Sequence, residues 1–335
     1  MVYAPKLLPG EPKLIGFRAG KVRLATMMLG VMLFFFTALG ASPASAEEGD
    51  AIAVIYPDIG EPYREIFEKI IEGVEAKIGS RVANYPVHSD TDIGALKAAL
   101  TRQSTKVVIA LGRHGMKAAT ALNINIGMVV GGVLTVPENE VRGNTVISLT
   151  PDPALLFARM KAMMPAMKRV FVVYDPTYNG WLLKLAKDSA RVQGLELVAH
   201  EAQDLRSAVR AYQEIFAVAE SSSDAIWLPQ DSVTVEESTI LPLVLQESWK
   251  QGYAVFSSNS THVRRGVLFS LYPDNLELGK SLAALAQGIL NSGDYSGQGM
   301  MPLRDVQSAI NLRTAKHLGL VRVRHQNFDM TFPEQ

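Results

Sequence analysis

The sequence has no cysteine among its 335 residues. A disulfide therefore cannot hold the fold, and chemistry that needs a thiol is excluded. A lipid anchor attached to an N-terminal cysteine, as in bacterial lipoproteins, is excluded for the same reason. We expect ordinary hydrophobic cores to stabilise the protein, since the chain is long enough to build two of them.

Sequence patterns typical of catalysis are also missing. The six histidines never form an H-E-x-x-H pattern, no acidic cluster has the spacing of a metal site, and neither G-x-S-x-G nor G-x-G-x-x-G occurs. Those motifs mark zinc proteases, serine hydrolases and dinucleotide-binding enzymes. The sequence therefore predicts a protein that is not an enzyme and that uses no metal or other cofactor.

Long apolar runs are scarce, and only residues 24–41 approach the length of a membrane span. This run follows a basic segment and precedes Ala44-Ser-Ala46, an A-x-A motif. The order is typical of a secretory signal peptide, and we predict cleavage after residue 46. An uncleaved membrane anchor is the alternative, but Pro43 and the small residues around it interrupt the apolar helix and favour cleavage.

Residues 47–335 carry little excess charge. The leader holds five basic residues and one acidic residue, so the rest of the chain keeps 28 basic and 32 acidic residues, a formal charge of −4. This mildly acidic balance does not suggest a basic face for nucleic acid. An exported protein without a lipid anchor would be lost from a cell with one membrane. We therefore expect the protein in the periplasm of a two-membrane bacterium.

Apolar runs alternate with amphipathic stretches through the rest of the chain. Four apolar runs lie between residues 51 and 130, separated by stretches with helical spacing, and the same plan restarts after residue 153. Such alternation predicts parallel sheets with helices on both faces. The predicted fold class is α/β, with two doubly wound, Rossmann-like lobes.

The stretch after Gly266 completes both lobes in this prediction. An apolar run at 267–271, an amphipathic helix at 276–290 and a short helix at 309–318 supply the elements that the lobes lack if the chain crosses between them three times. Three crossings form a hinge beside a cleft at the carboxyl ends of the strands, where α/β sheets place ligands. The predicted divisions are lobe one, 47–150 plus 267–300; lobe two, 151–266 plus 301–321; and a C-terminal tail, 322–335.

Several segments resemble a known family. Residues 309–320, Ala-Ile-Asn-Leu-Arg-Thr-Ala-Lys-His-Leu-Gly-Leu, are similar to a closing motif of that family, and residues 172–176, 225–231 and 265–274 also match. The chain resembles the periplasmic substrate-binding components of ABC transporters, with the type I periplasmic binding protein fold, in the TrpX-like branch. The resemblance implies a monomer that closes on a small polar ligand and delivers it to an ABC permease in the inner membrane. The TrpX-like branch suggests that this ligand is an amino acid.

One segment of the chain differs from the family pattern and leaves a second hypothesis for the function. Residues 131–137, after the fourth predicted strand, lack the family's usual segment of small residues and Thr-Asp-Pro. The alternative is a periplasmic accessory or sensor protein that uses the same fold to bind a protein partner.

In lobe one, the candidate ligand-binding residues follow the first, third and fourth predicted strands. They are Asp58, Tyr63, Gly112, Arg113, His114 and Gly132. Asp58 lies in a loop that opens at a strand end, although an acid there also serves as a helix cap. The glycines allow backbone N–H groups at a helix start to face an anion, and Arg113 adds a bidentate grip on a carboxylate. An ordinary strand-to-helix turn with a solvated arginine explains the same pattern.

The candidates in lobe two follow strands in the same way. They are Tyr178, Asn179, Gln230, Asp231, Ser257, Asn259 and Tyr272. Tyr178 supplies rigid apolar area with a polar end. Asp231 is the candidate partner for a ligand amine, with the capping of a short turn as its alternative role. The hydroxyl of Ser257 and the amide of Asn259 suit a small polar ligand, and Tyr272 lies beside the predicted crossing.

Overall fold

The computed structural model describes residues 51–61, 63–141, 143–320 and 327–333. The predicted signal peptide lies outside these ranges, as do residue 321 and residues 322–326 and 334–335 of the predicted tail. Within the described ranges, no helix has the length and apolar character needed to cross a membrane.

The first sheet contains six strands within the described residues, and every neighbouring pair is parallel. Apolar runs such as residues 107–111 are fully buried because helices cover both faces of the sheet. In order across the sheet, the strands are β11 (Gly299–Leu303), β5 (Thr145–Pro151), β4 (Gly127–Val133), β3 (Val107–Leu111), β1 (Ile52–Pro57) and β2 (Ala83–Val87).

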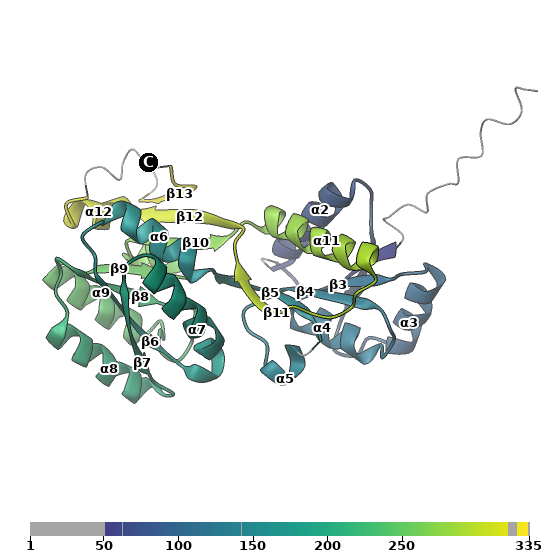
Figure 1. Cartoon of the computed structure of the whole chain (residues 1–335), viewed down its shortest axis with the longest axis horizontal. Coiled ribbons are helices and arrows are strands. Elements are labelled where there is room, and N and C mark those ends of the chain that lie inside the picture. Colours follow the sequence, from purple (N-terminus) through teal and green to yellow (C-terminus); the bar gives the residue numbers. More distant parts are fainter. Residues whose placement is uncertain (1–50, 62, 142, 321–326, 334–335) are drawn as a thin grey trace, which may run out of the picture. The chain divides into compact units, whose positions relative to one another are not determined.

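Two pairs of helices sandwich this sheet (Figure 1). Successive residues of β1 point to opposite faces, so Ile52 joins one core cluster and Ala53 the other. The first cluster includes α2 (Tyr63–Ile78) and α11 (Asn275–Ser292), and the second includes α3 (Ile93–Arg102) and α4 (Gly112–Ala121). The short α5 (Glu138–Val141) precedes β5.

Helices α2 and α11 approach each other through two glycines. A Cβ atom built at Gly73 would overlap the carbonyl oxygen of Leu276, and one at Gly279 would overlap the carbonyl oxygen of Ile70. The close contact places α11, distant in sequence, on the first sheet. This position agrees with the sequence prediction that a late helix completes the first lobe.

The second sheet contains seven strands within the described residues, all parallel to their neighbours except the antiparallel pair β10–β12. In order across the sheet, the strands are β13 (Met330–Phe332), β12 (Val306–Asn311), β10 (Phe269–Pro273), β9 (Ala254–Ser257), β8 (Asp224–Leu228), β6 (Arg169–Tyr174) and β7 (Glu196–Glu201).

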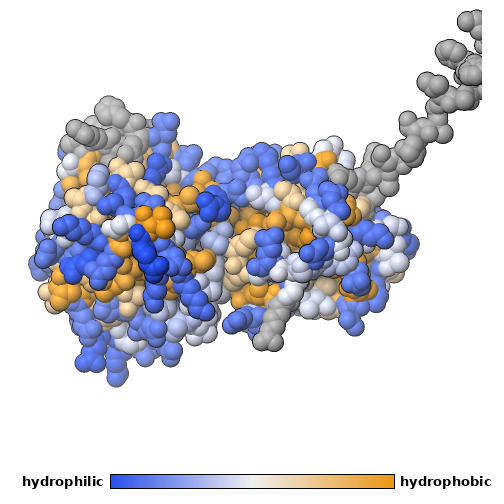
Figure 2. All heavy atoms as spheres, viewed as in Figure 1, coloured by the Kyte–Doolittle hydropathy of each residue, from blue (hydrophilic) through white to orange (hydrophobic). Residues whose placement is uncertain are grey.

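Helices cover both faces of the second sheet as well. One face packs against α6 (Pro153–Met163), α7 (Pro176–Val192) and α12 (Leu312–His317), and the other against α8 (Leu205–Val218) and α9 (Ile240–Gln251). The single-turn α10 (Thr261–Arg265) connects β9 to β10. The outer surfaces of these helices are mainly hydrophilic on the face shown in Figure 2, as amphipathic helices require.

The far end of the chain forms an edge strand of the second sheet. Residues 330–332 pair in parallel with β12 and extend the second sheet. Asp329 accepts hydrogen bonds from the backbone N–H of Ser308 at 2.7 Å and from its hydroxyl at 3.0 Å. Arg159 donates to the carbonyl of Asn327 at 3.0 Å. A strand of three residues is too short to show a hydrophobic period, so the sequence pattern did not reveal it.

Three connections join the sheets, between β5 and α6, between β10 and α11, and between β11 and β12. The sequence prediction assigned residues 267–300 to lobe one and placed the second crossing at 267–271. Instead, β10 pairs with β9 and β12, and the chain leaves the second sheet only after Pro273. A buried apolar strand has the same pattern in either sheet, which explains this difference.

The three connections are tied to one another. The N–H of Asp152 donates to Leu303 O at 2.8 Å, and the N–H of Asp274 donates to Asp305 O at 2.9 Å. Both aspartates also cap the helix that follows them. The Asp274 carboxylate accepts a further bond from Gln307 at 3.2 Å, so one residue links the second connection to the third.

Candidate functional site

A cavity of about 570 Å³ lies at the carboxyl ends of strands from both sheets. Its volume falls within the usual range for small-molecule sites. The first sheet supplies residues that follow β4 or belong to β5, and the second supplies residues that follow β6, β8 and β9. The lining residues are Leu134, Thr135, Thr150, Tyr178, Asn179, Gln230, Asp231, Ser232, Val235, Glu236, Glu237, Asn259 and His262.

Asp231 holds two loops of this cavity together. One carboxylate oxygen accepts hydrogen bonds from the Asp175 N–H at 2.8 Å and from Asn179 Nδ2 at 3.0 Å. The other oxygen accepts from the N–H groups of Val233 and Thr234, both at 2.9 Å. A carboxylate has about four acceptor positions, and the chain fills all four. The arrangement matches the capping role that the sequence left open for Asp231.

His262 belongs to a hydrogen-bonded chain along the cavity wall. Asn259 Oδ1 accepts bonds from the N–H and hydroxyl of Thr261 at 3.0 and 2.8 Å, which turns the Asn259 NH₂ group toward His262 Nε2 at 3.4 Å. An NH₂ group donates, so Nε2 is the acceptor and the imidazole proton lies on Nδ1. Nδ1 donates to Ser257 Oγ at 2.8 Å, and Ser257 donates to Leu228 O at 3.2 Å.

This chain of bonds requires a neutral imidazole. His262 is 3% exposed, and burial lowers its pKa to about 4, against a smaller opposing effect of Glu237. Protonation at Nε2 would make two hydrogen-bond donors, the imidazole N–H and the Asn259 NH₂ group, face each other. His262 therefore positions Asn259 at the cavity as an uncharged group near neutral pH.

Ser257 Oγ and His262 Nδ1 are 2.8 Å apart, as in the nucleophile–base pair of a hydrolase, but a substrate cannot reach them. Ser257 is fully buried, and it is absent from the cavity lining. Its Oγ already accepts from the Asn259 N–H at 3.0 Å and donates to Leu228 O. A nucleophile must reach a substrate, so this hydroxyl serves as a structural link.

The described lining includes acidic side chains but no lysine or arginine. Glu236 accepts hydrogen bonds from the N–H groups of Ser238 at 2.8 Å and Thr239 at 2.6 Å, and these bonds lower its pKa to about 2. Glu237 is more exposed and pairs with Arg265 at 3.4 Å. The cavity thus combines negative charge with the exposed apolar surfaces of Leu134 and Tyr178, which are 42% and 46% exposed.

The candidates predicted in lobe one do not line this cavity. Asp58 contacts His88 at 3.1 Å and Arg64 at 3.6 Å, beside a separate cavity of about 310 Å³. Tyr63 is 61% exposed at the start of α2. Arg113 pairs with Glu140 at 3.2 Å, and the adjacent His114 is exposed.

Gly112 and Gly132 allow a close fit at the ends of β3 and β4. Their φ angles are 67° and 69°, in the left-handed region that favours glycine. A Cβ atom at Gly112 would lie 3.2 Å from the Phe67 ring, and one at Gly132 would lie 3.1 Å from the same ring. Phe67 therefore occupies the place where the sequence suggested an anion.

Tyr272 lies in β10, opposite Gln307 of β12. It packs against a small core cluster formed by Val263, Ala309 and Phe332, and burial raises the pKa of its phenol. Its position is beside the connection that leaves β10, away from the cavity lining.

Sequence reasoning missed several lining residues. They are Leu134, Thr135, Thr150, Ser232, Val235, Glu236, Glu237 and His262. Leu134 and Thr135 directly follow β4, so the rule that ligands meet strand ends was a usable signal for them. His262 had no such signal, because a single histidine in a short helix has no distinctive spacing.

Two doubly wound sheets, three connections and a cavity at the strand ends define a type I periplasmic binding protein fold. A family model described as ABC transporter substrate binding protein matches residues 72–325. This match covers well over half of the chain, so the protein belongs to that family. Proteins of this family are in general binding proteins rather than enzymes, and they typically act outside the cytoplasm.

Solved structures share the fold at low sequence identity. A ligand-free, open substrate binding protein with adhesive properties from Clostridium difficile is 16% identical with a TM-score of 0.59, covering 84% of this chain and 98% of that chain. An ABC domain in complex with L-Trp from Streptococcus pneumonia is 14% identical with a TM-score of 0.51, covering 84% and 99%. A conserved domain protein from Vibrio cholerae is 20% identical with a TM-score of 0.50, covering 84% and 99%. No curated protein matches the sequence.

Proposed function

We propose that the chain is the periplasmic solute-binding component of an ABC importer. In this function it closes its two lobes on a small polar ligand and presents the closed form, as a monomer, to a permease in the inner membrane. The observation that carries the proposal is the cavity of about 570 Å³, which takes its lining from both sheets. The sequence pattern of residues 1–46 supports export, and the family supports transport.

Closure of the two lobes would follow from ligand contacts made by residues of both lobes. A ligand that touches residues of both sheets, such as Thr135 and Tyr178, gains more contacts when the lobes come together. Such a ligand shifts the population toward the closed form by its difference in affinity for the two forms. The three connections act as the hinge, since they are the segments that pass between the sheets.

The lining chemistry narrows the ligand class. Asp231, Glu236 and Glu237 make the cavity negative, and the described lining has no basic side chain to grip an anionic ligand. A small molecule with amine or hydroxyl donors and some apolar surface fits this environment, and an amino acid belongs to that class. We assign direct ligand contacts to Tyr178, Gln230 and Asn259, whereas Asp231 and Asn179 hold the loops.

A thermal-shift screen of the protein purified from the periplasm tests the proposal. Amino acids and other small polar metabolites are the compounds, and a stabilising compound should also reduce the radius measured by X-ray scattering. Tyr178→Ala should weaken binding about tenfold or more, since burying an aromatic side chain against a ligand contributes about 1.5 kcal/mol or more.

Val192→Ala is the matched control, because Val192 lies on the same helix, α7, and is 82% exposed outside the cavity. It should bind as the unchanged protein does. If no compound stabilises the protein and the radius stays constant, the transport proposal fails, and the accessory or sensor hypothesis takes its place.

A further inference from the structure

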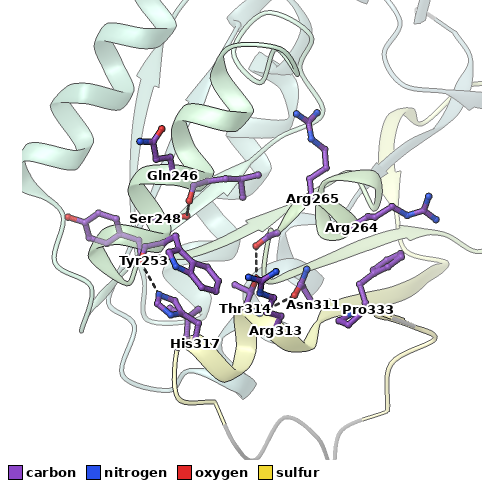
Figure 3. Close-up of a pocket in the computed structure, with 15 residues that line it drawn as sticks. Gln246, Ser248, Tyr253, Arg264, Arg265, Asn311, Arg313, Thr314, His317 and Pro333 are labelled. Atoms are coloured by element: carbon purple, nitrogen blue, oxygen red, sulfur yellow. Dashed lines mark hydrogen bonds between the residues drawn. The ribbon is translucent and has the colours of Figure 1, made fainter. Parts of the chain in front are cut away.

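A second cavity, of about 600 Å³, lies on the second sheet away from the first, and the two share no lining residue. It is walled by α9, α10, α12 and β13 (Figure 3). Nothing in the proposed transport function uses this cavity. We call it the α9–α12 groove.

The apolar wall of the groove is firmly built. Trp249 of α9 stacks on His317 of α12, with ring centroids 3.8 Å apart and planes 7° apart. His317 Nε2 also lies 2.9 Å from the carbonyl oxygen of Trp249. Trp249 is nevertheless 44% exposed, so part of its surface remains open to the groove. Tyr253 and Phe332, both largely buried, continue the apolar surface.

Three arginines line the groove, and they differ in what they contact. Arg265 donates to the Glu237 carbonyl at 2.9 Å and pairs with its carboxylate, and Figure 3 shows its side chain directed away from Asn311 and Thr314. Arg264 lies over the Phe332 ring at 5.4 Å. Neither guanidinium is therefore the natural anchor for a ligand in the centre of the groove.

Arg313 is the arginine whose guanidinium lies over the exposed Trp249 ring, 5.7 Å from its centroid. Figure 3 shows it beside Asn311 and Thr314. Among the described residues, no carboxylate pairs with it and no hydrogen bond engages it. The neighbouring polar groups are occupied, since Asn311 donates to Val263 O at 2.8 Å and Thr314 donates to Gly266 O at 2.8 Å.

A guanidinium without an acidic partner, beside an exposed aromatic wall, matches one kind of ligand. We propose that the α9–α12 groove binds a small organic anion that carries a carboxylate on an apolar body. Arg313 forms the charge-assisted pair with the carboxylate, for which its planar donor pattern is suited. The apolar body lies against Trp249 and Tyr253, which exclude water from the pair.

Calorimetric titration of the full protein with three probes tests the two parts of this ligand. Benzoate carries both the ring and the carboxylate, benzyl alcohol keeps the ring without the charge, and inorganic phosphate keeps a charge without the ring. We expect benzoate to bind at least tenfold more tightly than either of the others. The proposed ligand class would be wrong if all three probes bound equally tightly. It would also be wrong if phosphate bound as tightly as benzoate, because the ring would then contribute nothing.

Matched charge variants locate the binding. Arg313→Gln should weaken benzoate binding tenfold or more. Lys316→Gln removes the same charge from the same helix at an exposed residue outside the groove, and should leave binding unchanged. Tyr178→Ala, in the other cavity, should also leave it unchanged. If Tyr178→Ala abolishes benzoate binding and Arg313→Gln does not, the anion occupies the first cavity and this inference is wrong, while the transport proposal stands.

Discussion

At the scale of the single residue, His262 links solution pH to the stability of the cavity wall. Burial lowers its pKa to about 4, whereas a histidine in the unfolded chain titrates near 6.5. Between these two values the unfolded chain binds the extra proton, so acid favours unfolding. We expect this group to reduce the free energy of unfolding by up to about 3 kcal/mol as the pH falls from 6.5 to 4.

Urea unfolding measured across that pH range isolates the effect. In His262→Gln the free energy of unfolding should change less between pH 6.5 and 4 than in the unchanged protein. His114→Gln is the control, since His114 is exposed on α4, and its variant should keep the full pH dependence. Identical pH profiles for the unchanged protein and His262→Gln would refute the buried neutral imidazole.

A substitution at Asp231 distinguishes the two roles predicted from the sequence, a partner for a ligand amine and the cap of a short turn. If its carboxylate mainly holds the loops, Asp231→Asn places an NH₂ group against backbone donors and should lower the free energy of unfolding by about 2–4 kcal/mol. Asp188→Asn, at a 74% exposed side chain on α7, should change it by less than about 0.5 kcal/mol. A ligand-binding carboxylate would give the opposite pattern in Asp231→Asn: unchanged stability with lost ligand affinity.

Individual residues also show how much of the candidate site could be predicted from the sequence. Tyr178, Gln230 and Asn259 were candidates because they follow apolar runs, and parallel strands bring such positions to one edge. The same rule selected Gly112 and Gly132, but it does not state what fills the space beside a glycine. Here Phe67, from α2, fills it, and this packing depends on tertiary structure.

At the scale of the element, the contact between α2 and α11 leaves no room for a side chain at two positions of the first lobe. Gly73 and Gly279 face backbone atoms, which cannot rotate away as a side chain can. Gly73→Ala or Gly279→Ala should therefore cost about 3 kcal/mol or more of the free energy of unfolding, at or beyond the usual cost of overpacking.

Gly288→Ala provides the matched control for these variants. Gly288 lies on the same helix, and a Cβ atom there would meet nothing within 4 Å. Because alanine favours a helix over glycine, this variant should gain about 0.5–1 kcal/mol. Thermal or urea unfolding of the three variants gives the comparison, and equal stability of Gly279→Ala and Gly288→Ala would contradict the close packing.

Elements differ in how well their sequence predicts them. The alternation of apolar runs and amphipathic helices predicted the two α/β sheets, since period and length report on burial. The place of α11 followed from counting the elements that each lobe needed. The sheet of β10 was not predictable in this way, because its partners β9 and β12 are set by tertiary contacts. Strand β13 was missed because three residues carry too little pattern.

At the scale of the whole molecule, the proposed closure must bend the three connections, and Asp274 is where two of them meet. Its carboxylate caps α11 through the N–H groups of Leu276 and Glu277, both at 3.1 Å, and accepts a bond from Gln307 in β12. Its own N–H donates to Asp305 O at 2.9 Å. Loss of the carboxylate should therefore loosen the second and third connections together.

Hydrogen exchange at backbone amides measures this loosening directly. In Asp274→Ala, the amide of residue 274 should exchange about fivefold faster, because a lost cap costs about 1 kcal/mol and local opening rises accordingly. Asp204→Ala removes a comparable cap from α8, which packs with α9 on the second sheet, and should leave this amide unchanged. Faster exchange in both variants would mean a general loss of stability. Faster exchange in Asp274→Ala alone would support a hinge at Asp274, whose side chain holds two of the segments that flex in the proposed closure.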